Sequence, residues 1–373
     1  MSAEVFYKKC KNYDYEKIYE FVEGLIGEKG VYSEILKSGM KVLLKPNMLA
    51  PFHEDMCVTT NPLLVSAVAN VVRKRGCEVW VGDSPGGDFS KGIDALWNKT
   101  GMYKSIQNIS EQVIFEKEPI YLPLEDGKVC KKILLSEYYL HADVIINLPK
   151  LKTHTFTLLS GGIKNLFGLV PGRIKGLYHK EYPNISEFSE FLMDLAEFIK
   201  PELTIIDGIW GMEGHGPGAS GTPVNLGILL ASTNVLAVDI AMTQYVGIPA
   251  EAVPYIKKGI ERKAFGICDV TNVVWNGEKV YYDKEIRIDG GIESYISSDK
   301  KNTGYNVRHP FLDKTKCTGC KRCIENCPQK TIQFMNGFPE FGNACIGCMC
   351  CMEMCLQGAI LPEAVTRDID ICQ

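Results

Sequence analysis

The sequence has no long hydrophobic run and no excess of charge of one sign. No stretch reaches the ~18 apolar residues that a membrane-spanning helix needs. The 41 basic and 45 acidic side chains give a formal net charge of −4, so no global positive field attracts nucleic acid or anionic lipid. The first residues also lack the apolar segment of a signal peptide. We therefore expect a soluble, cytoplasmic protein with neither a nucleic-acid nor a membrane partner.

Several familiar motifs are missing. The chain contains no G-x-x-x-x-G-K-[ST], which disfavours a P-loop NTPase, and no G-x-S-x-G, which removes one hydrolase signature. Residues 216–221 match G-x-G-x-x-G, but that motif binds a dinucleotide only where it opens a helix. Because residues 222–225 lead into a strand pattern instead, we predict no dinucleotide site there. No other flavin or nicotinamide motif is visible.

Cysteine, in contrast, is abundant and unevenly distributed. Ten of the 15 cysteines fall between Cys317 and Cys372. A secreted disulfide scaffold would be small and would carry an export signal, so clustered thiols in this long chain indicate metal binding. The remaining cysteines and Cys372 have no ligand spacing, and we expect them to be small buried apolar residues. The five cysteines outside the tail are Cys10, Cys57, Cys77, Cys130 and Cys268.

Two cysteine runs in the tail share one spacing. Residues 317–328 read C-x2-C-x2-C-x3-C-P, and residues 345–355 repeat the cysteine spacing 28 residues later, with Leu356 in place of the proline. In such a run three thiolates wrap one iron–sulfur cube and the fourth points to the neighbouring cube. Two [4Fe–4S] clusters are therefore predicted. One is held by Cys317, Cys320, Cys323 and Cys355, and the other by Cys345, Cys348, Cys351 and Cys327.

Zinc is the alternative metal, since it also binds thiolates at C-x2-C spacing. Zinc sites normally use two pairs of ligands rather than two runs of four, so the pattern favours iron. Cys350 is an extra thiol inside the second run. We interpret it as a bystander, and a role as an alternative ligand to Cys351 stays open. The tail resembles the bacterial two-cluster ferredoxin family, which implies an α+β electron-relay module.

The remainder of the chain alternates between strand and helix patterns. An apolar strand at 41–47, a helix from the N-cap Asn61 to Gly76 and a strand at 78–83 form a βαβ unit. Further strands are predicted at 142–147, 203–207 and 226–231, with helices opening at Ser186 and after Asn234. Asp126-Gly127 and Asn276-Gly277 indicate two hairpins. We predict an α/β core with a mostly parallel sheet and helices on both faces over 1–305, then a ferredoxin-type domain over 306–373.

Polar side chains follow several of these strands, where open parallel sheets bind ligands. Few acids lie between residues 147 and 180, which favours an anionic ligand such as a carboxylate or phosphate. The predicted substrate-binding residues are Lys45, Asn47, Asp83, Lys150, Lys152 and Asn165. The predicted catalytic residues are His154, His215 and Lys164, the histidines because their pKa values lie near neutrality.

Other interpretations of these residues stay open. Single Asp or Asn residues after strands often cap helices or turns. Asp239, near a predicted helix start, is expected to complement the helix dipole. Asp83, Asp207 and Glu213 are the candidate ligands of a divalent ion.

Four short motifs occur together in the core: Lys45-Pro46-Asn47, residues 82–86 (GDSPG), residues 148–154 (LPKLKTH) and residues 161–165 (GGIKN). This combination resembles the domain-of-unknown-function 362 family of iron–sulfur-associated proteins, over about residues 40–250. The resemblance implies an α/β core that is often fused to a ferredoxin-like module. It implies no substrate.

Three functions are compatible with this organisation. In the first, the tandem clusters exchange electrons with an anionic small molecule in the core, as in a redox enzyme or one of its subunits. In the second, the protein is a non-catalytic ferredoxin-type carrier whose core docks a redox partner protein. In the third, the clusters only staple the tail to the core, which is disfavoured because a staple needs one cluster.

Overall fold

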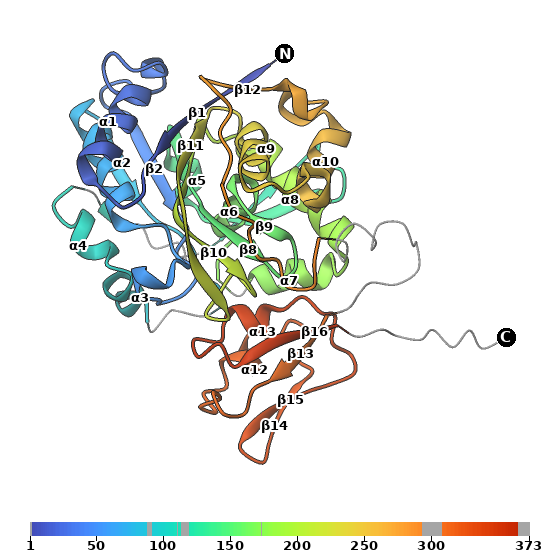
Figure 1. The fold of residues 1–373 in the computed structure, drawn as a ribbon. Helices are drawn as coiled ribbons and strands as arrows, with labels where there is room; N and C mark the ends of the chain where they lie inside the picture. The colour runs from blue at the N-terminus through green and yellow to red at the C-terminus, as the bar shows by residue number, and fades with distance from the viewer. Residues whose placement is uncertain are drawn as a thin grey trace.

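The computed structural model describes residues 2–87, 92–109, 111–112, 119–172, 174–292 and 308–364. A larger α/β unit, the core, carries a smaller C-terminal unit, the module, against one end of its sheet (Figure 1). The predicted boundary near residue 305 and Cys372 lie outside the described residues. Within these ranges, every helix is too short or too polar to cross a membrane.

A ten-stranded sheet forms the centre of the core, with β12-β1-β11-β10-β7-β2-β3-β4 as its main path. From β10 through β7, β2, β3 and β4 all neighbours are parallel, whereas β11 is antiparallel to both β1 and β10. The sheet is therefore mostly parallel, as predicted. Its strands are β1 (Ala3–Lys9), β2 (Lys41–Pro46), β3 (Glu78–Val81), β4 (Glu111–Gln112), β7 (Val144–Leu148), β8 (Lys150–His154), β9 (Leu158–Ser160), β10 (Leu203–Gly214), β11 (Gly221–Ser232) and β12 (Val273–Trp275).

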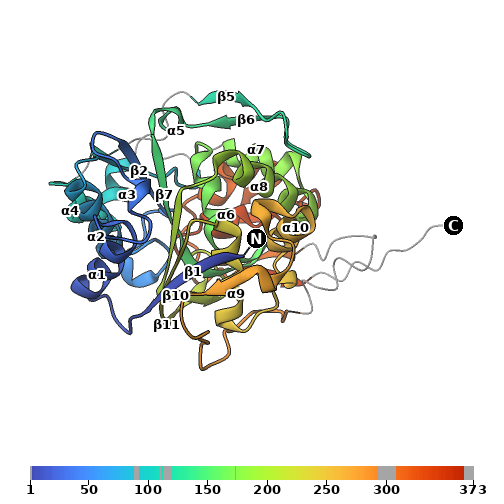
Figure 2. The same ribbon diagram turned by 90° about the horizontal axis from the view of Figure 1, so that it is seen from above.

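Helices cover both faces of this sheet (Figure 2). Successive strand residues point to opposite faces, so Val42 and Leu44 of β2 join one apolar cluster and Leu43 joins the other. The first cluster includes α1 (Tyr15–Ile26) and α2 (Pro62–Lys74), and the second includes α8 (Ile185–Ile199), α9 (Val235–Val246) and α10 (Pro254–Arg262). The other helices of the core are α3 (Ile93–Lys99), α4 (Met102–Ile106), α5 (Tyr138–His141), α6 (Gly162–Leu166) and α7 (Ile174–Glu181).

Helix starts follow their capping residues. Asn61 caps α2 by accepting from the Leu63 amide, with Pro62 as the first helical residue, and Asn234 caps α9. Helix α8 begins at Ile185, one residue before the predicted start at Ser186, because Asn184 caps it.

One of the two predicted hairpins is present. Strands β5 (Ile120–Pro123) and β6 (Lys132–Leu135) pair antiparallel around Asp126-Gly127. The hairpin predicted at Asn276-Gly277 is wrong, because β12 pairs in parallel with β1 and with no other described strand. The glycine motif at 216–221 lies between the antiparallel strands β10 and β11 and opens no helix, as predicted.

The module is a small α+β unit with an internal repeat. Three pairs of positions 28 residues apart have positive φ: Gly319 (67°) and Gly347 (66°), Lys321 (64°) and Met349 (59°), Lys330 (53°) and Gly358 (59°). The backbone therefore repeats along with the cysteines. Its elements are β13 (Arg308–Leu312), α12 (Arg322–Glu325), β14 (Ile332–Met335), β15 (Phe338–Phe341), α13 (Cys350–Glu353) and β16 (Ile360–Ala364), with β13 antiparallel to β16 and β14 to β15.

Candidate functional site

The cysteines of the module line two separate small cavities. Cys317, Cys320, Cys323 and Cys355 line the first, and Cys327, Cys345, Cys348 and Cys351 line the second. These are the two ligand sets predicted from spacing, each drawing its fourth thiol from the other run. Four thiols around one cavity fit the donor set of an iron–sulfur cube. We name the first cavity the outer cluster site and the second cavity the inner cluster site.

Backbone amides point at two of these sulfurs. The Gly347 amide lies 3.4 Å from Sγ of Cys345, and the Ala359 amide lies 3.3 Å from Sγ of Cys355. Hydrogen bonds to cluster sulfurs tune reduction potential. Each site thus contains at least one such donor.

The module packs on the core through an interface, which we call the seam, that contains both apolar and polar contacts. Met354 joins an apolar cluster with Ala50, Phe52 and Met212, and the Ser220 hydroxyl donates to the Ile360 carbonyl at 3.0 Å. Glycines of the core allow this close approach: a Cβ on Gly86 would lie 2.7 Å from Sδ of Met354, and one on Gly218 would lie 3.1 Å from the Glu353 carbonyl oxygen.

A cavity of about 370 Å³, the seam cavity, lies between the two units. From the core it is lined by Asn47, Asp83, Lys164, Asn165, Lys175 and His179, among others, and from the module by Cys327, Cys350, Glu353 and Met354. A smaller pocket of about 40 Å³ shares Asn47, Lys164, Asn165 and Glu353 with it and extends to Lys150, Lys152 and His154. Most of the predicted core residues therefore gather around one site.

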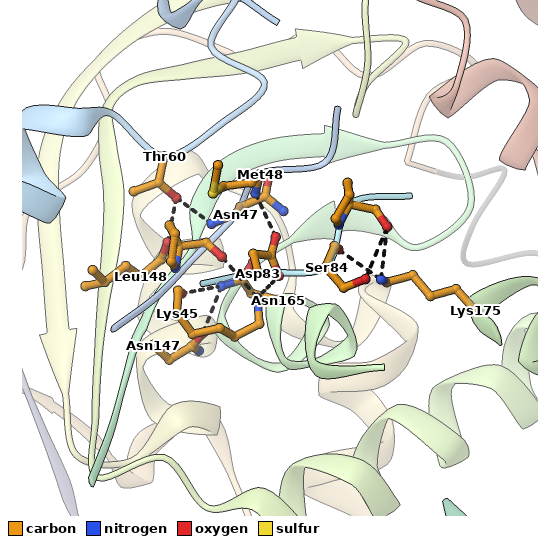
Figure 3. A network of polar contacts seen from close by, with 12 residues as sticks. Lys45, Asn47, Met48, Thr60, Asp83, Ser84, Asn147, Leu148, Asn165 and Lys175 are labelled. Carbon is orange, nitrogen blue, oxygen red and sulfur yellow. Dashed lines mark hydrogen bonds and ion pairs between the residues drawn. The ribbon is translucent and has the colours of Figure 1, made fainter. Parts of the chain in front are cut away.

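Lys45 lies outside both linings. Its ammonium is fully buried and donates to Oδ1 of Asp83 at 2.8 Å, while Oδ2 of Asp83 accepts from the Met48 amide at 2.7 Å (Figure 3). Gly168 packs directly over this ion pair, where a Cβ would overlap the Asp83 carboxylate. Lys45 thus neutralises Asp83 beneath the cavity and does not reach the ligand space predicted for it.

A chain of amides connects the sheet to the cavity. Asn165 Nδ2 donates to Oδ1 of Asn147 at 2.8 Å and to the Lys45 carbonyl at 3.2 Å (Figure 3). Oδ1 of Asn165 has no hydrogen-bond partner among the described residues, and the residue is buried, with only 5% of its surface exposed. A buried amide oxygen left unpaired beside a cavity is a candidate ligand contact.

Strand β8 directs three alternate polar side chains toward the smaller pocket. Lys150 donates to Asp207 at 2.6 Å, so its charge is neutralised. Lys152 donates to Oδ1 of Asn47 at 2.8 Å and to the Val58 carbonyl at 2.7 Å, both uncharged acceptors. Burial lowers the pKa of Lys152 to about 7, and the nearby Lys164 and Lys150 also act to lower it.

His154 faces an acid of the module. Its Nδ1 accepts from the Phe156 amide at 3.1 Å, which places the ring proton on Nε2, 3.2 Å from Oε1 of Glu353. Burial, together with Lys164, lowers the pKa of His154 to about 4. The pKa of Glu353 is lowered to about 2, because His154 and Lys164 outweigh the effect of its burial. At neutral pH the pair is therefore a neutral imidazole and a carboxylate.

Lys164 and the uncharged ring of His179 complete this side of the cavity. Burial lowers the pKa of Lys164, and its Nζ lies 5.4 Å from the Phe167 ring centroid without a hydrogen bond in the described part of the chain. Burial also lowers the pKa of His179 to about 3, and its ring stacks on Phe188. Nδ1 of His179 has no partner among the described residues.

Three other predicted residues lie elsewhere. His215 pairs with Asp289 at 3.2 Å and lines neither pocket. Asp207 is bound by Lys150, and Glu213 accepts from the Arg287 amide. Within the described ranges no three such side chains gather to hold one ion. The divalent-ion alternative thus has no convergent ligand set there.

Two expectations for single residues need correction. Asp239 lies inside α9, where its carboxylate accepts from the amides of Gly162 at 2.6 Å and Ile163 at 3.0 Å, so it caps α6 rather than its own helix. Burial raises its pKa to about 7. Cys268 is exposed, whereas the other scattered cysteines of the core are buried as predicted.

Some residues at the site were not found from the sequence. Glu353 lies inside the second cysteine run but belongs to no motif that predicts its role, and His179 lies in a helix and does not follow a strand. Lys175 binds the carbonyls of Ser84 at 2.9 Å and Pro85 at 3.3 Å, which anchors α7 to the loop after β3 (Figure 3). Cys350, taken for a bystander, lines the seam cavity and neither cluster site.

The α/β core and the cysteine spacing together define an iron–sulfur protein. Residues 42–244 match the family described as a domain of unknown function (DUF362), and residues 309–356 match a 4Fe-4S dicluster domain. The chain belongs to the domain-of-unknown-function 362 family, with an iron–sulfur module at its C-terminal end.

Two known proteins are similar to this chain. The thylakoid-associated protein sll1697 of Synechocystis sp. is 32% identical over 255 residues, which cover 68% of this chain and 78% of that protein. The lactate racemase apoprotein of Thermoanaerobacterium thermosaccharolyticum has a TM-score of 0.40 and 14% identity, over 62% of this chain and 54% of that chain.

Proposed function

We propose that the protein is an iron–sulfur oxidoreductase, or a subunit of one, in which two [4Fe–4S] clusters exchange electrons with a small anionic molecule in the seam cavity. The observation that carries this proposal is the lining of the cavity. Lys164 lines it from the core, and Cys327, a thiol of the inner cluster site, lines it from the module. A ligand there lies beside the inner cluster, which supplies one-electron chemistry when bound.

The charges around the cavity support an anionic ligand. Asp83 is neutralised by Lys45, and the three lysines of the lining, Lys164, Lys175 and Lys330, outnumber its two other acids, Glu325 and Glu353. The ammonium of Lys164 keeps its hydrogen-bonding capacity for a carboxylate or phosphate oxygen, a charge-assisted bond of about 1.5–3 kcal/mol. His154, a neutral imidazole at neutral pH, holds its Nε2–H toward the Glu353 carboxylate, so its role is to position this acid at the cavity wall.

Ligand-dependent reoxidation of the clusters tests this proposal. The protein is reduced photochemically without oxygen, and small carboxylates and phosphates are screened for those that reoxidise it faster than buffer does, followed by visible absorbance. We expect the Lys164→Gln variant to lose about tenfold or more in the rate at subsaturating ligand. Lys104→Gln, at an exposed lysine of α4, is the matched control and keeps the rate.

Two results would overturn the proposal. One is that no small anion reoxidises clusters whose EPR signals are intact. The other is that Lys164→Gln reacts as fast as the unsubstituted protein. The first result favours the carrier hypothesis, in which electrons leave to a partner protein.

A further inference from the structure

The two cluster sites differ in their distance from the core. Cys327 and Pro328 of the inner site line the seam cavity, whereas no thiol of the outer site does. Gly319, in the first cysteine run, packs against Phe334 of β14, where a Cβ would lie 3.5 Å from Cζ. Strands β14 and β15 lie at the end of the module away from the core sheet (Figure 1).

The surface around the outer site is basic. Residues 311–322 contain Lys314, Lys316, Lys321 and Arg322 but only one acid, Asp313, which is 3.6 Å from Lys316. Lys321 and Arg322 line the outer cluster site itself. The protein as a whole has a net charge of −4, so this concentration of positive charge is local.

Apolar side chains are exposed within this basic surface. Phe334 is 40% exposed and Met335 is 47% exposed. Nζ of Lys321 lies 4.6 Å from the Phe334 ring centroid, and Cys320 of the outer site is itself exposed. We call the surface formed by Lys314, Lys316, Cys320, Lys321 and Phe334 the outer face. An apolar centre with a charged rim is typical of transient protein interfaces.

We propose that the outer face docks a small one-electron carrier protein with an acidic surface, which exchanges electrons with the outer cluster. This inference rests on the proposed function and names its partner. In each encounter the reduced carrier is oxidised by one electron and the outer cluster is reduced by one, with no bond formed or broken. Complementary charge steers such encounters and accelerates association.

Stopped-flow reduction of the holoprotein by a reduced, acidic plant-type [2Fe–2S] ferredoxin tests this proposal. The second-order rate is measured at about 10 mM and about 0.5 M salt, because the Debye length shrinks severalfold over that range. We expect the rate to fall about tenfold or more with salt. A rate independent of ionic strength overturns the proposal without the use of any variant.

Charge reversal locates the surface. The triple variant Lys314→Glu, Lys316→Glu, Lys321→Glu is expected to lose about tenfold in the low-salt rate. The control Lys29→Glu, Lys99→Glu, Lys104→Glu changes the net charge equally at exposed lysines of the core and is expected to stay within about twofold. An equal loss in both overturns the proposal. If the triple variant loses its clusters, the corresponding Lys→Gln changes replace it.

The two proposals fail separately. After photochemical reduction, reoxidation by a seam-cavity ligand bypasses the docking step and is expected to be unchanged in the outer-face variant. A salt-dependent ferredoxin reaction without any reoxidising anion would support the outer face and contradict the cavity proposal. The reverse result would contradict the outer face alone.

Discussion

At the scale of single residues, neighbouring thiols in the second cysteine run face different cavities. Cys351 lines the inner cluster site, and Cys350 lines the seam cavity. Both lie in α13, where successive side chains point about 100° apart around the helix axis. Spacing in the sequence selected Cys351 as the ligand because it keeps the interval of the first run. The sequence contained no feature that predicts what Cys350 faces.

Serine substitution at these two positions is expected to separate their roles. Cys351→Ser removes an inner-site thiol, so the iron content should fall from about eight toward about four per chain. Cys350→Ser should keep about eight. Iron and sulfide quantification with EPR of the reduced protein measures both. Equal iron loss in the two variants would mean that Cys350 is a ligand.

At the scale of elements, local patterns predicted the strands better than their partners. The β2-α2-β3 unit was predicted from the apolar periodicity of its elements and from the Asn61-Pro62 helix start. These signals are all local in the sequence. The second hairpin failed because a turn motif does not specify which strand pairs with which, and β12 instead joins β1 from the other end of the core. Pairing across such a separation is decided by packing.

Strand β8 shows that the partners of charged side chains also cannot be predicted from the local sequence. The sequence around Lys150, Lys152 and His154 contains few acids, which suggested a free cationic site. The acids come from distant elements: Asp207 of β10 binds Lys150, and Glu353 of α13 faces His154. Position along the strand predicted that these side chains converge, but their acidic partners could be identified only from the tertiary structure.

Lys152 makes stability depend on pH. Its folded-state pKa of about 7 lies below its ordinary value of 10.5, so between these pH values the unfolded chain binds more protons. The free energy of unfolding contributed by this group therefore rises with pH across that window. We expect Lys152→Met to lose this rise, besides a cost of about 1–3 kcal/mol for leaving Asn47 and Val58 without a donor.

Urea unfolding at pH 7, 8 and 9, followed by tryptophan fluorescence of the core, measures this effect. The control Lys104→Met, at an exposed lysine, should keep the slope of the unsubstituted protein. A Lys152→Met variant with the same slope would show that Lys152 does not titrate in this range.

At the scale of the whole molecule, the two units have separate apolar cores. The two large clusters of the core contain no module residue, and the module has its own cluster around Ile332, Met352 and Ile360. Among the residues that the structure describes, one small apolar cluster, with Met354, spans the seam. The α/β core therefore depends little on the module for its stability, whereas the seam cavity needs both units.

Removal of iron is expected to affect the two units differently. Without clusters, eight thiols have no common ligand, and the module, with few apolar contacts of its own, should open. We expect hydrogen exchange to increase across residues 308–364 and at Leu49 and Gly86 on the seam. Amides of β2 and β7 should stay protected. Loss of protection across the sheet would contradict the independence of the core.

The divided lining of the seam cavity has a consequence for partly assembled protein. A chain that has not yet received its iron presents only one wall of the cavity and cannot enclose a ligand. Empty chains in a mixed population would then neither sequester the ligand nor compete with loaded chains for it. Occupancy of the cavity would report that cofactor loading is complete, a form of quality control that follows from where the two units meet.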